Sequence, residues 1–219
     1  MFIVAHRGAS AYELENTIDA FEKAIQLGAK FLECDIRLSK DNQLVVIHDA
    51  NLQRIWRVNA NVNELTAKEL EKYKVPKLEA VLDLIKKADV KLLVEIKEEG
   101  VEEMLAKMLK KKGVLRKVIV VSFFENSLAK IKKLINVKIG LIFSLRQDAL
   151  EVALKLKPNF IIPRSDVATK ELVQIAHKNK MKVIAWTVDD VEQAKKLFKM
   201  HVDGIASNKP DLMKEYDKI

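Results

Sequence analysis

The sequence predicts an α/β protein, a closed (β/α)8 barrel of the TIM type with an extra β-hairpin near residues 33–48. Short apolar runs alternate with amphipathic segments of helical periodicity along the whole chain, which is typical of repeated βα units. Runs such as Val118-Ile-Val-Val121 are apolar on both faces, as buried parallel strands are. At 219 residues, the chain fits one barrel. We therefore expect a single domain over residues 1–219 without a large insertion, with a doubly wound open sheet as the alternative.

Apolar runs and helical periodicity place the elements in order. The predicted strands are residues 2–5, 30–38, 43–48, 91–96, 117–122, 138–143, 159–162, 182–187 and 203–206. The predicted helices are residues 16–27, 66–73, 77–88, 101–112, 125–135, 146–156, 169–179, 190–200 and 209–216. The sequence Thr66-Ala-Lys-Glu69 is a capping box, and Gly28 and Gly113 stand where helices should end. Residues 51–63 are the longest irregular stretch, and we expect them to form a loop on the site side.

Nine strands are one too many for an eight-stranded barrel, and the spacing between Asp35 and His48 offers the reason. Only 12 residues separate them, too few for a strand and a parallel crossover. A hairpin with a two-residue turn at Asp41-Asn42 fits better, and it pairs Asp35 directly with His48. Glu33 lies two residues along on the same face. The sequence thus predicts that Glu33, Asp35 and His48 converge, although a one-residue slip in register would turn His48 away.

Composition and charge exclude several classes of protein. The chain is 49% hydrophobic and 32% charged, which is typical of a globular protein, and no apolar run reaches the roughly 18 residues of a membrane span. The first predicted strand begins at Phe2, which leaves no room for a secretory leader. A single cysteine, Cys34, suits a reducing compartment and alternates with Glu33 and Asp35, so we interpret it as a core residue. We expect a cytoplasmic protein without stable membrane insertion.

The net charge of +8 comes from 39 basic and 31 acidic residues. We interpret lysine runs on the predicted helices as solvated faces, with a field that attracts anionic substrates as the second possibility. No helix-turn-helix, zinc-finger or aromatic RNA-binding motif accompanies the charge, so we expect no nucleic-acid partner. The oligomeric state stays open.

Three carboxylates, two imidazoles and two cations stand at or near the ends of predicted strands in the first half of the chain. Glu33, Asp35 and Glu95 offer hard oxygen ligands, which favour one divalent cation, Mg2+ or Ca2+, over zinc. The alternative is that these acids only form ion pairs. His6 and His48 are candidates for proton transfer because imidazole titrates near neutrality.

Four further residues are candidates for binding substrate. Arg7 and Lys97 are placed to bind an anion, and Gly8 would let the backbone approach a ligand. Asn16 could contact a ligand or cap a helix, and Trp186 could wall a pocket or belong to the core.

Several motifs resemble those of the glycerophosphodiester phosphodiesterase family. They are His6-Arg7-Gly8, Glu15-Asn16-Thr17, Glu33-x-Asp35, His48-Asp49, Glu95-Ile96-Lys97, Val121-Ser-Phe123, Ala185-Trp-Thr-Val188, Asp203-Gly-Ile205 and Asn208-Lys-Pro210. The likeness runs from Phe2 to about Asp211. Two departures are Leu14, where the family usually has proline, and residues 52–63, which lack the usual threonine and glycine pattern.

The resemblance implies a phosphatidylinositol-phospholipase-C-like barrel that hydrolyses glycerophosphodiesters, small molecules of lipid and glycerol metabolism, to glycerol 3-phosphate and an alcohol. It implies a divalent metal on Glu33, Asp35 and Glu95, an acid/base pair of His6 and His48, and phosphate binding by Arg7 and Lys97. The alternatives are a phospholipase-D-like hydrolase of lysophospholipids, a phosphate-binding barrel without catalysis, and a basic nucleic-acid-binding protein.

Overall fold

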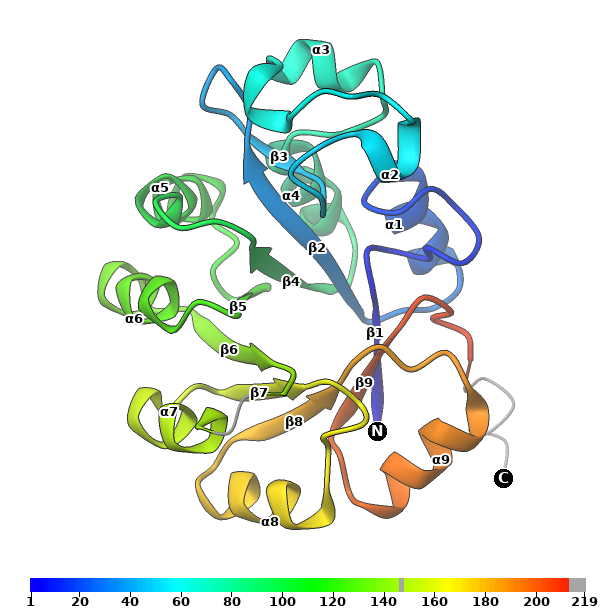
Figure 1. Ribbon diagram of the computed structural model, residues 1–219, viewed down its shortest axis with the longest axis vertical. Coiled ribbons are helices and arrows are strands. Elements are labelled where there is room, and N and C mark those ends of the chain that lie inside the picture. Colours follow the sequence, from blue (N-terminus) through cyan, green and yellow to red (C-terminus); the bar gives the residue numbers. More distant parts are fainter. Residues whose placement is uncertain (146–147, 213–219) are drawn as a thin grey trace.

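Eight parallel strands close a barrel in the computed structural model, which describes residues 1–145 and 148–212 (Figure 1). The ring runs β1, β9, β8, β7, β6, β5, β4, β2, and pairing of β1 with β2 closes it. The strands of the ring are β1 (Phe2–Ala5), β2 (Phe31–Leu38), β4 (Lys91–Ile96), β5 (Val118–Ser122), β6 (Lys138–Phe143), β7 (Phe160–Pro163), β8 (Lys182–Ala185) and β9 (Gly204–Ser207). The predicted TIM-type barrel is confirmed.

Helices surround the ring, as Figure 1 shows. They are α1 (Ile18–Gln26), α2 (Gln53–Trp56), the 3-10 turn η1 (Val62–Glu64), α3 (Ala67–Glu71), α4 (Leu78–Lys87), α5 (Glu102–Lys112), α6 (Glu125–Leu134), α7 (Ala149–Leu156), α8 (Lys170–Lys178) and α9 (Val191–Lys199). The predicted capping box at Thr66 is present, and Gly113 ends α5 with φ of +68°. No helix within the described ranges has both the length and the apolar character that crossing a membrane requires.

Three predicted segments differ from the structure or extend beyond it. Residues 51–63 are not a plain loop, because they contain α2 and the first two residues of η1. Residues 210–212 form a turn, and the rest of the helix predicted over 209–216 lies outside the described residues. The helix predicted over 146–156 is observed as α7, with positions 146 and 147 likewise outside them.

Two apolar layers follow from the alternation of side chains along the strands. Residues such as Val4, Leu93 and Ile184 point into the barrel and form an inner core. The residues between them, including Leu92 and Val94, pack outward against the helices. Cys34 lies in this outer layer and is fully buried, whereas its neighbours Glu33 and Asp35 point inward. The interpretation of Cys34 as a core residue is confirmed.

The extra strand β3 (Leu44–Val46) runs antiparallel to β2 outside the ring, as predicted, but in a different register. Leu38 pairs with Leu44 and Ile36 with Val46, so the predicted pairing of Asp35 with His48 is wrong by one residue. The reason is a longer turn: Ser39 N donates to Gln43 O, and Asn42 takes a left-handed φ of +54°.

Candidate active site

Three buried carboxylates converge inside the barrel, two from the middle of β2 and one from the carboxyl end of β4. Glu33, Asp35 and Glu95 are 5%, 1% and 8% exposed, and each offers an oxygen within 4.8 Å of the others. Strand alternation puts Glu33 and Asp35 on one face, and the parallel register of β2 and β4 places Asp35 beside Glu95. This is the edge at which TIM-type barrels carry their active sites.

The electrostatics of this cluster favour a cation. Glu33 Oε1 and Asp35 Oδ1 are buried and have no hydrogen-bond partner among the described residues. Burial, followed by the charges of Asp35 and Glu95, raises the pKa of Glu33 well above its usual value. Burial and Asp35 raise the pKa of Glu95 to about 7. Hard, mutually repelling oxygens with unused lone pairs are the donor set that Mg2+ or Ca2+ takes, so the residues fit the predicted metal.

Arg7 and Lys97 reach the same carboxylates from two strand ends. Arg7 Nε lies 3.3 Å from Asp35 Oδ2, and Lys97 Nζ lies 2.6 Å from Glu95 Oε1 and 3.6 Å from Asp35 Oδ1. Burial acts to raise the pKa of Asp35, but Arg7 and Lys97 outweigh it and hold that pKa below its usual value. Three carboxylates against two cations leave one excess negative charge. A divalent cation together with a monoanionic phosphodiester would neutralise the site.

The loop after β1 owes its path to Gly8. Arg7 has a left-handed φ of +56° and its backbone N donates to Glu33 Oε2 (2.9 Å). A Cβ at Gly8, where φ is +82°, would lie 2.7 Å from Ala20 of α1. The small residue therefore permits close packing against α1, while the approach of its backbone to a ligand stays a prediction.

His6 is oriented by a chain of polar contacts from β9 and the β8–α9 loop. Its Nδ1 lies 2.8 Å from Asn208 Oδ1, while Asn208 Nδ2 donates to Asp189 Oδ2 (2.5 Å). Because the Asn208 oxygen can only accept, His6 Nδ1 carries the proton and Nε2 keeps its lone pair. Burial, followed by Arg7, lowers the pKa of His6, which favours the neutral ring.

His48 enters the site from the opposite side, just after β3. Its Nδ1 lies 2.7 Å from Asp49 Oδ1, and its side chain is 31% exposed. Burial lowers the pKa of His48, as do Arg7 and Lys97, whereas Asp35 and Asp49 act against them. His48 and Glu33 line the same cavity, and Asp35 is close enough to act on the pKa of His48, so the predicted convergence of these three residues is observed despite the shifted register. His6 lines this cavity too. The strand stops at Val46, and a bend at residues 48–50 redirects the chain.

The cavity is walled by apolar side chains and encloses about 130 Å³. Trp186 both lines it and packs against the inner core, so both of its expected roles are observed. Its Nε1 donates to Ile162 O (2.9 Å), and its ring packs edge-on against Phe123 at 5.7 Å. Phe123 also lies 5.7 Å beneath Lys97 Nζ. Apolar walls lower the local dielectric constant around the charges, which strengthens their interaction with a bound anion.

Asn16 is 3% exposed and belongs to the carboxylate cluster. Its Nδ2 donates to Asp35 Oδ2 (2.8 Å) and its Oδ1 accepts from Asp35 N. The helix cap is Thr17, whose side chain accepts from Ala20 N. The structure thus shows Asn16 holding Asp35, while its contact with substrate stays a prediction.

Arg54 on α2 joins two parts of the site and was missed by the sequence analysis. Its guanidinium donates to both Glu15 oxygens (2.7 and 2.9 Å) and to Asp49 Oδ2 (2.5 Å). Glu15 also accepts from Arg7, and Asp49 holds His48. Arg54 therefore connects Glu15, the partner of Arg7, to Asp49, the partner of His48. Because α2 is only one turn long, no periodicity in the sequence marks this position.

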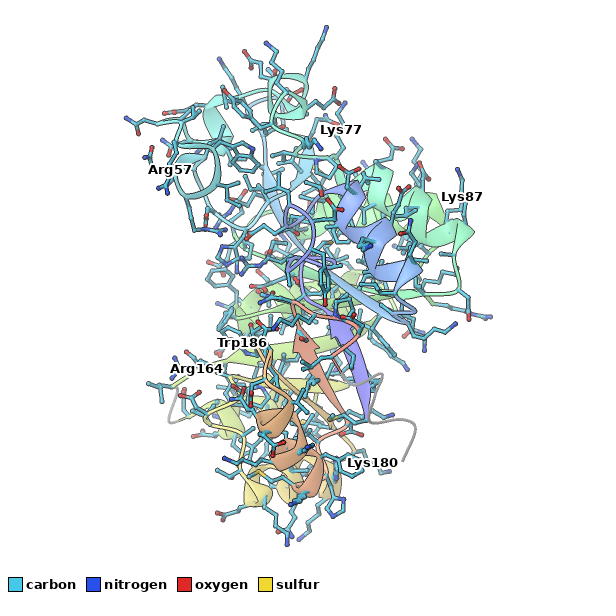
Figure 2. The ribbon with its side chains drawn as sticks, turned by 90° about the vertical axis from the view of Figure 1, so that its right-hand side faces the viewer. Arg57, Lys77, Lys87, Arg164, Lys180 and Trp186 are labelled. Carbon is cyan, nitrogen blue, oxygen red and sulfur yellow. The ribbon has the colours of Figure 1, made fainter. Side chains whose placement is uncertain are left out.

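Arg54→Lys is expected to lower kcat/KM about 10- to 100-fold, the usual effect of losing a group that orients a functional side chain. An ammonium keeps the charge but lacks the fork that spans two carboxylates. Unfolding should change little, because the Arg54 side chain is 48% exposed. Steady-state kinetics and thermal unfolding measure both. The control is Arg57→Lys, a substitution at an exposed arginine three residues along the chain (labelled in Figure 2). Equal kinetics for the two variants would contradict the linking role.

Residues 6–212 match the model of the glycerophosphoryl diester phosphodiesterase family. The chain belongs to this family of phosphoric diester hydrolases. It is 34% identical over 231 residues to a glycerophosphodiester phosphodiesterase of Caldanaerobacter subterraneus subsp. tengcongensis, covering 96% of this chain and 95% of that one.

Solved structures of the family share the whole architecture. The glycerophosphodiester phosphodiesterase of Thermotoga maritima superimposes with a TM-score of 0.88 at 27% identity, covering 99% of this chain and 98% of that one. A phosphodiesterase of Oleispira antarctica, solved with the product sn-glycerol-3-phosphate, has a TM-score of 0.89 at 23% identity, covering 100% of this chain and 97% of that one. That likeness concerns the fold.

Proposed function

We propose that the enzyme hydrolyses glycerophosphodiesters to glycerol 3-phosphate and an alcohol, with one divalent cation, Mg2+ or Ca2+, on Glu33, Asp35 and Glu95. The observation that carries this is the convergence of three buried carboxylates, two cations and two imidazoles on one small cavity. The product complex of the Oleispira antarctica phosphodiesterase supports the same chemistry. The cation would supply positive charge to the phosphate oxygens.

The proposed roles of the side chains follow from their partners. Arg7 and Lys97 bind the phosphate, because both cations line the cavity beside the carboxylates. His6 accepts the proton of the attacking hydroxyl at Nε2, because its Nδ1 already holds one. His48 donates a proton to the leaving alkoxide; Asp35 and Asp49 favour its imidazolium form, against the burial and the cations that lower its pKa.

The cavity favours a compact substrate over a lipid. Its volume of about 130 Å³ is below the roughly 300–1,000 Å³ of sites for larger ligands. A lysophospholipid remains the second candidate. Its support is the apolar wall around Trp186 and a 24% identical relative, a lysophospholipase D of Rattus norvegicus, covering 97% of this chain and 85% of that one. Comparing lysophosphatidylcholine with glycerophosphocholine separates the two candidates.

Incubation with glycerophosphocholine or glycerophosphoethanolamine is expected to release glycerol 3-phosphate in the presence of Mg2+ or Ca2+ and not in EDTA. Enzymatic detection of glycerol 3-phosphate measures the reaction. Release that is unaffected by EDTA would contradict the metal assignment, and no release from any diester would contradict the function.

A cytoplasmic location is part of the proposal and rests on the single, buried Cys34, which suits a reducing compartment. Fractionation of the source cells tests it, and recovery of the protein outside the cytoplasm would contradict it.

A further inference from the structure

The end of the barrel opposite the catalytic cavity holds a second, wider cavity of about 580 Å³. Residues at the beginnings of the strands line it. Figure 2 shows the separation of the two ends, with Trp186 on the catalytic side and Lys180, which lines the second cavity, on the other. Neither the sequence motifs nor the proposed reaction uses this end of the barrel.

Three lysines form one layer of this cavity. Lys91, Lys138 and Lys182 are the first residues of β4, β6 and β8, which are alternate strands of the ring. Side chains two residues apart on a strand point to the same face. Each lysine lies two residues before a residue that faces the barrel interior, for example Lys91 before Leu93, so it starts on that same face. The three lysine side chains therefore start from inward-facing positions and line this cavity, at a level where TIM barrels ordinarily carry a layer of apolar side chains.

Two more cations, Arg116 and Lys180, complete the lining. All five basic side chains belong to exposed residues, and none forms an ion pair with any residue of ranges 1–145 and 148–212. The described residues that line the cavity include no carboxylate. The adjoining cavity, of about 460 Å³, adds Lys132, Lys133 and Lys157 to the same surface, also without a carboxylate among the described lining residues.

This lack of counter-charge is local. Elsewhere lysines have acidic partners: Lys112 contacts Glu79 and Asp83, and Lys155 contacts Glu151. The two acids in the loops leading into β4 and β9 are already engaged, Asp89 with Lys30 and Asp203 with His177. Uncompensated like charges around one cavity destabilise the folded state, and a bound anion relieves that repulsion.

The floor of the cavity is aromatic. Phe2 and Phe31 stack with their ring centroids 4.4 Å apart, and Lys91 Nζ lies 5.5 Å from the centroid of the Phe31 ring. The volume is that of a small-molecule site. A single orthophosphate is too small to contact cations on four separate segments of the chain, whereas a chain of phosphates can.

We propose that the cavity at the beginning of the barrel strands binds a multiply charged phosphate compound, of the size and charge of a short polyphosphate or a nucleoside triphosphate. Lys91, Lys138 and Lys182 contact the phosphates, and the stacked Phe2 and Phe31 rings form the floor beneath them. The site is independent of the catalytic residues.

Isothermal titration calorimetry of the full-length protein with tripolyphosphate, ATP and orthophosphate at low salt tests the proposal. Tripolyphosphate and ATP are expected to bind and orthophosphate to bind far more weakly, and added salt should weaken all binding. Lys138→Gln/Lys182→Gln is expected to weaken binding at least about tenfold, since each removes a charge-assisted contact. Lys138→Arg/Lys182→Arg should retain it.

The comparison of ATP with tripolyphosphate identifies the ligand. A higher affinity for ATP that is lost in Phe2→Leu would identify a nucleotide, whereas equal affinities would identify the polyphosphate chain alone.

The matched control is Lys68→Gln/Lys72→Gln, which removes the same charge beside α3, away from both cavities. Equal affinities for this control and for the Lys138/Lys182 glutamine variant would overturn the proposal. So would the absence of binding to the parent protein, or binding only to vesicles of anionic lipid, which would indicate a membrane-facing surface instead. Glycerophosphodiester hydrolysis should be the same in all variants, so the outcome does not depend on the proposed reaction.

Discussion

Glu33→Gln is expected to abolish cation-dependent hydrolysis and, at the same time, to stabilise the cation-free protein. Activity should fall at least about 100-fold, because a neutral amide is a poor ligand for a hard dication. Stability should rise by on the order of 1 kcal/mol, or about 2–4 °C in Tm, because the substitution removes a carboxyl group whose ionisation is opposed by burial and by the charges of Asp35 and Glu95. The backbone donor at Arg7 N keeps an oxygen acceptor.

The gain in stability should depend on pH. The folded-state pKa of Glu33 is raised, so its ionisation costs stability as the pH rises above the unfolded value of about 4.5. The difference in Tm between Glu33→Gln and the parent should therefore be largest near neutral pH and shrink toward pH 4.5. Thermal unfolding in EDTA at several pH values measures it, and added Mg2+ or Ca2+ should stabilise only the parent.

Glu102→Gln is the matched control, because Glu102 is equally buried but its carboxylate is well supplied with donors. Ser127 Oγ lies 2.5 Å from it, Gly100 N donates to it, and its side chain is 3% exposed. Glu102→Gln should lower stability and leave the activity of the folded protein and its response to cations intact. If Glu33→Gln instead destabilised the cation-free protein and kept its activity, the metal assignment would be wrong.

Replacing either site histidine by alanine is expected to lower kcat by about 10²- to 10⁴-fold, the usual contribution of general acid–base catalysis. His6→Ala removes the proposed acceptor of the proton from the attacking hydroxyl, which Asn208 orients. His48→Ala removes the proposed donor of a proton to the leaving alkoxide, which Asp49 orients. The stabilisation by Mg2+ or Ca2+ should persist in both variants, since neither ring belongs to the carboxylate cluster. His177→Ala, on α8, should keep full activity.

A change of leaving group distinguishes the two roles. An ester of glycerol phosphate with p-nitrophenol needs no protonation of the departing oxygen, so the variant that lacks the general acid should recover most of its rate. We expect this recovery for His48→Ala and not for His6→Ala. The opposite pattern would reverse the two assignments, and no loss of rate in either variant would refute acid–base catalysis by histidine.

The barrel was predictable because its signals are local and repeated. Strands that are apolar on both faces alternate with amphipathic helices along the chain, and all nine predicted strands are observed. The carboxylate cluster was predictable too, since alternation puts Glu33 and Asp35 on one face and neighbouring parallel strands bring Glu95 to them.

Other features depend on how the loops fold. The β2–β3 register was wrong because residues 39–43 form a longer turn than two residues, and His48 reaches the cavity through a bend after the strand. Arg54 could not be found, because its importance lies in contacts with Glu15 and Asp49 across separate loops.

Hydrophobic periodicity and the succession of strands and helices are set by residues close together in the sequence. Spacing along the chain was therefore enough to predict the barrel and the carboxylate cluster inside it. Loop conformation balances many weak contacts between distant residues, and those contacts exist only once the barrel has closed. The tertiary structure therefore decided which nitrogen of His6 holds a proton, how Arg54 connects Arg7 to His48, and that lysines of three alternate strands meet at the opposite end.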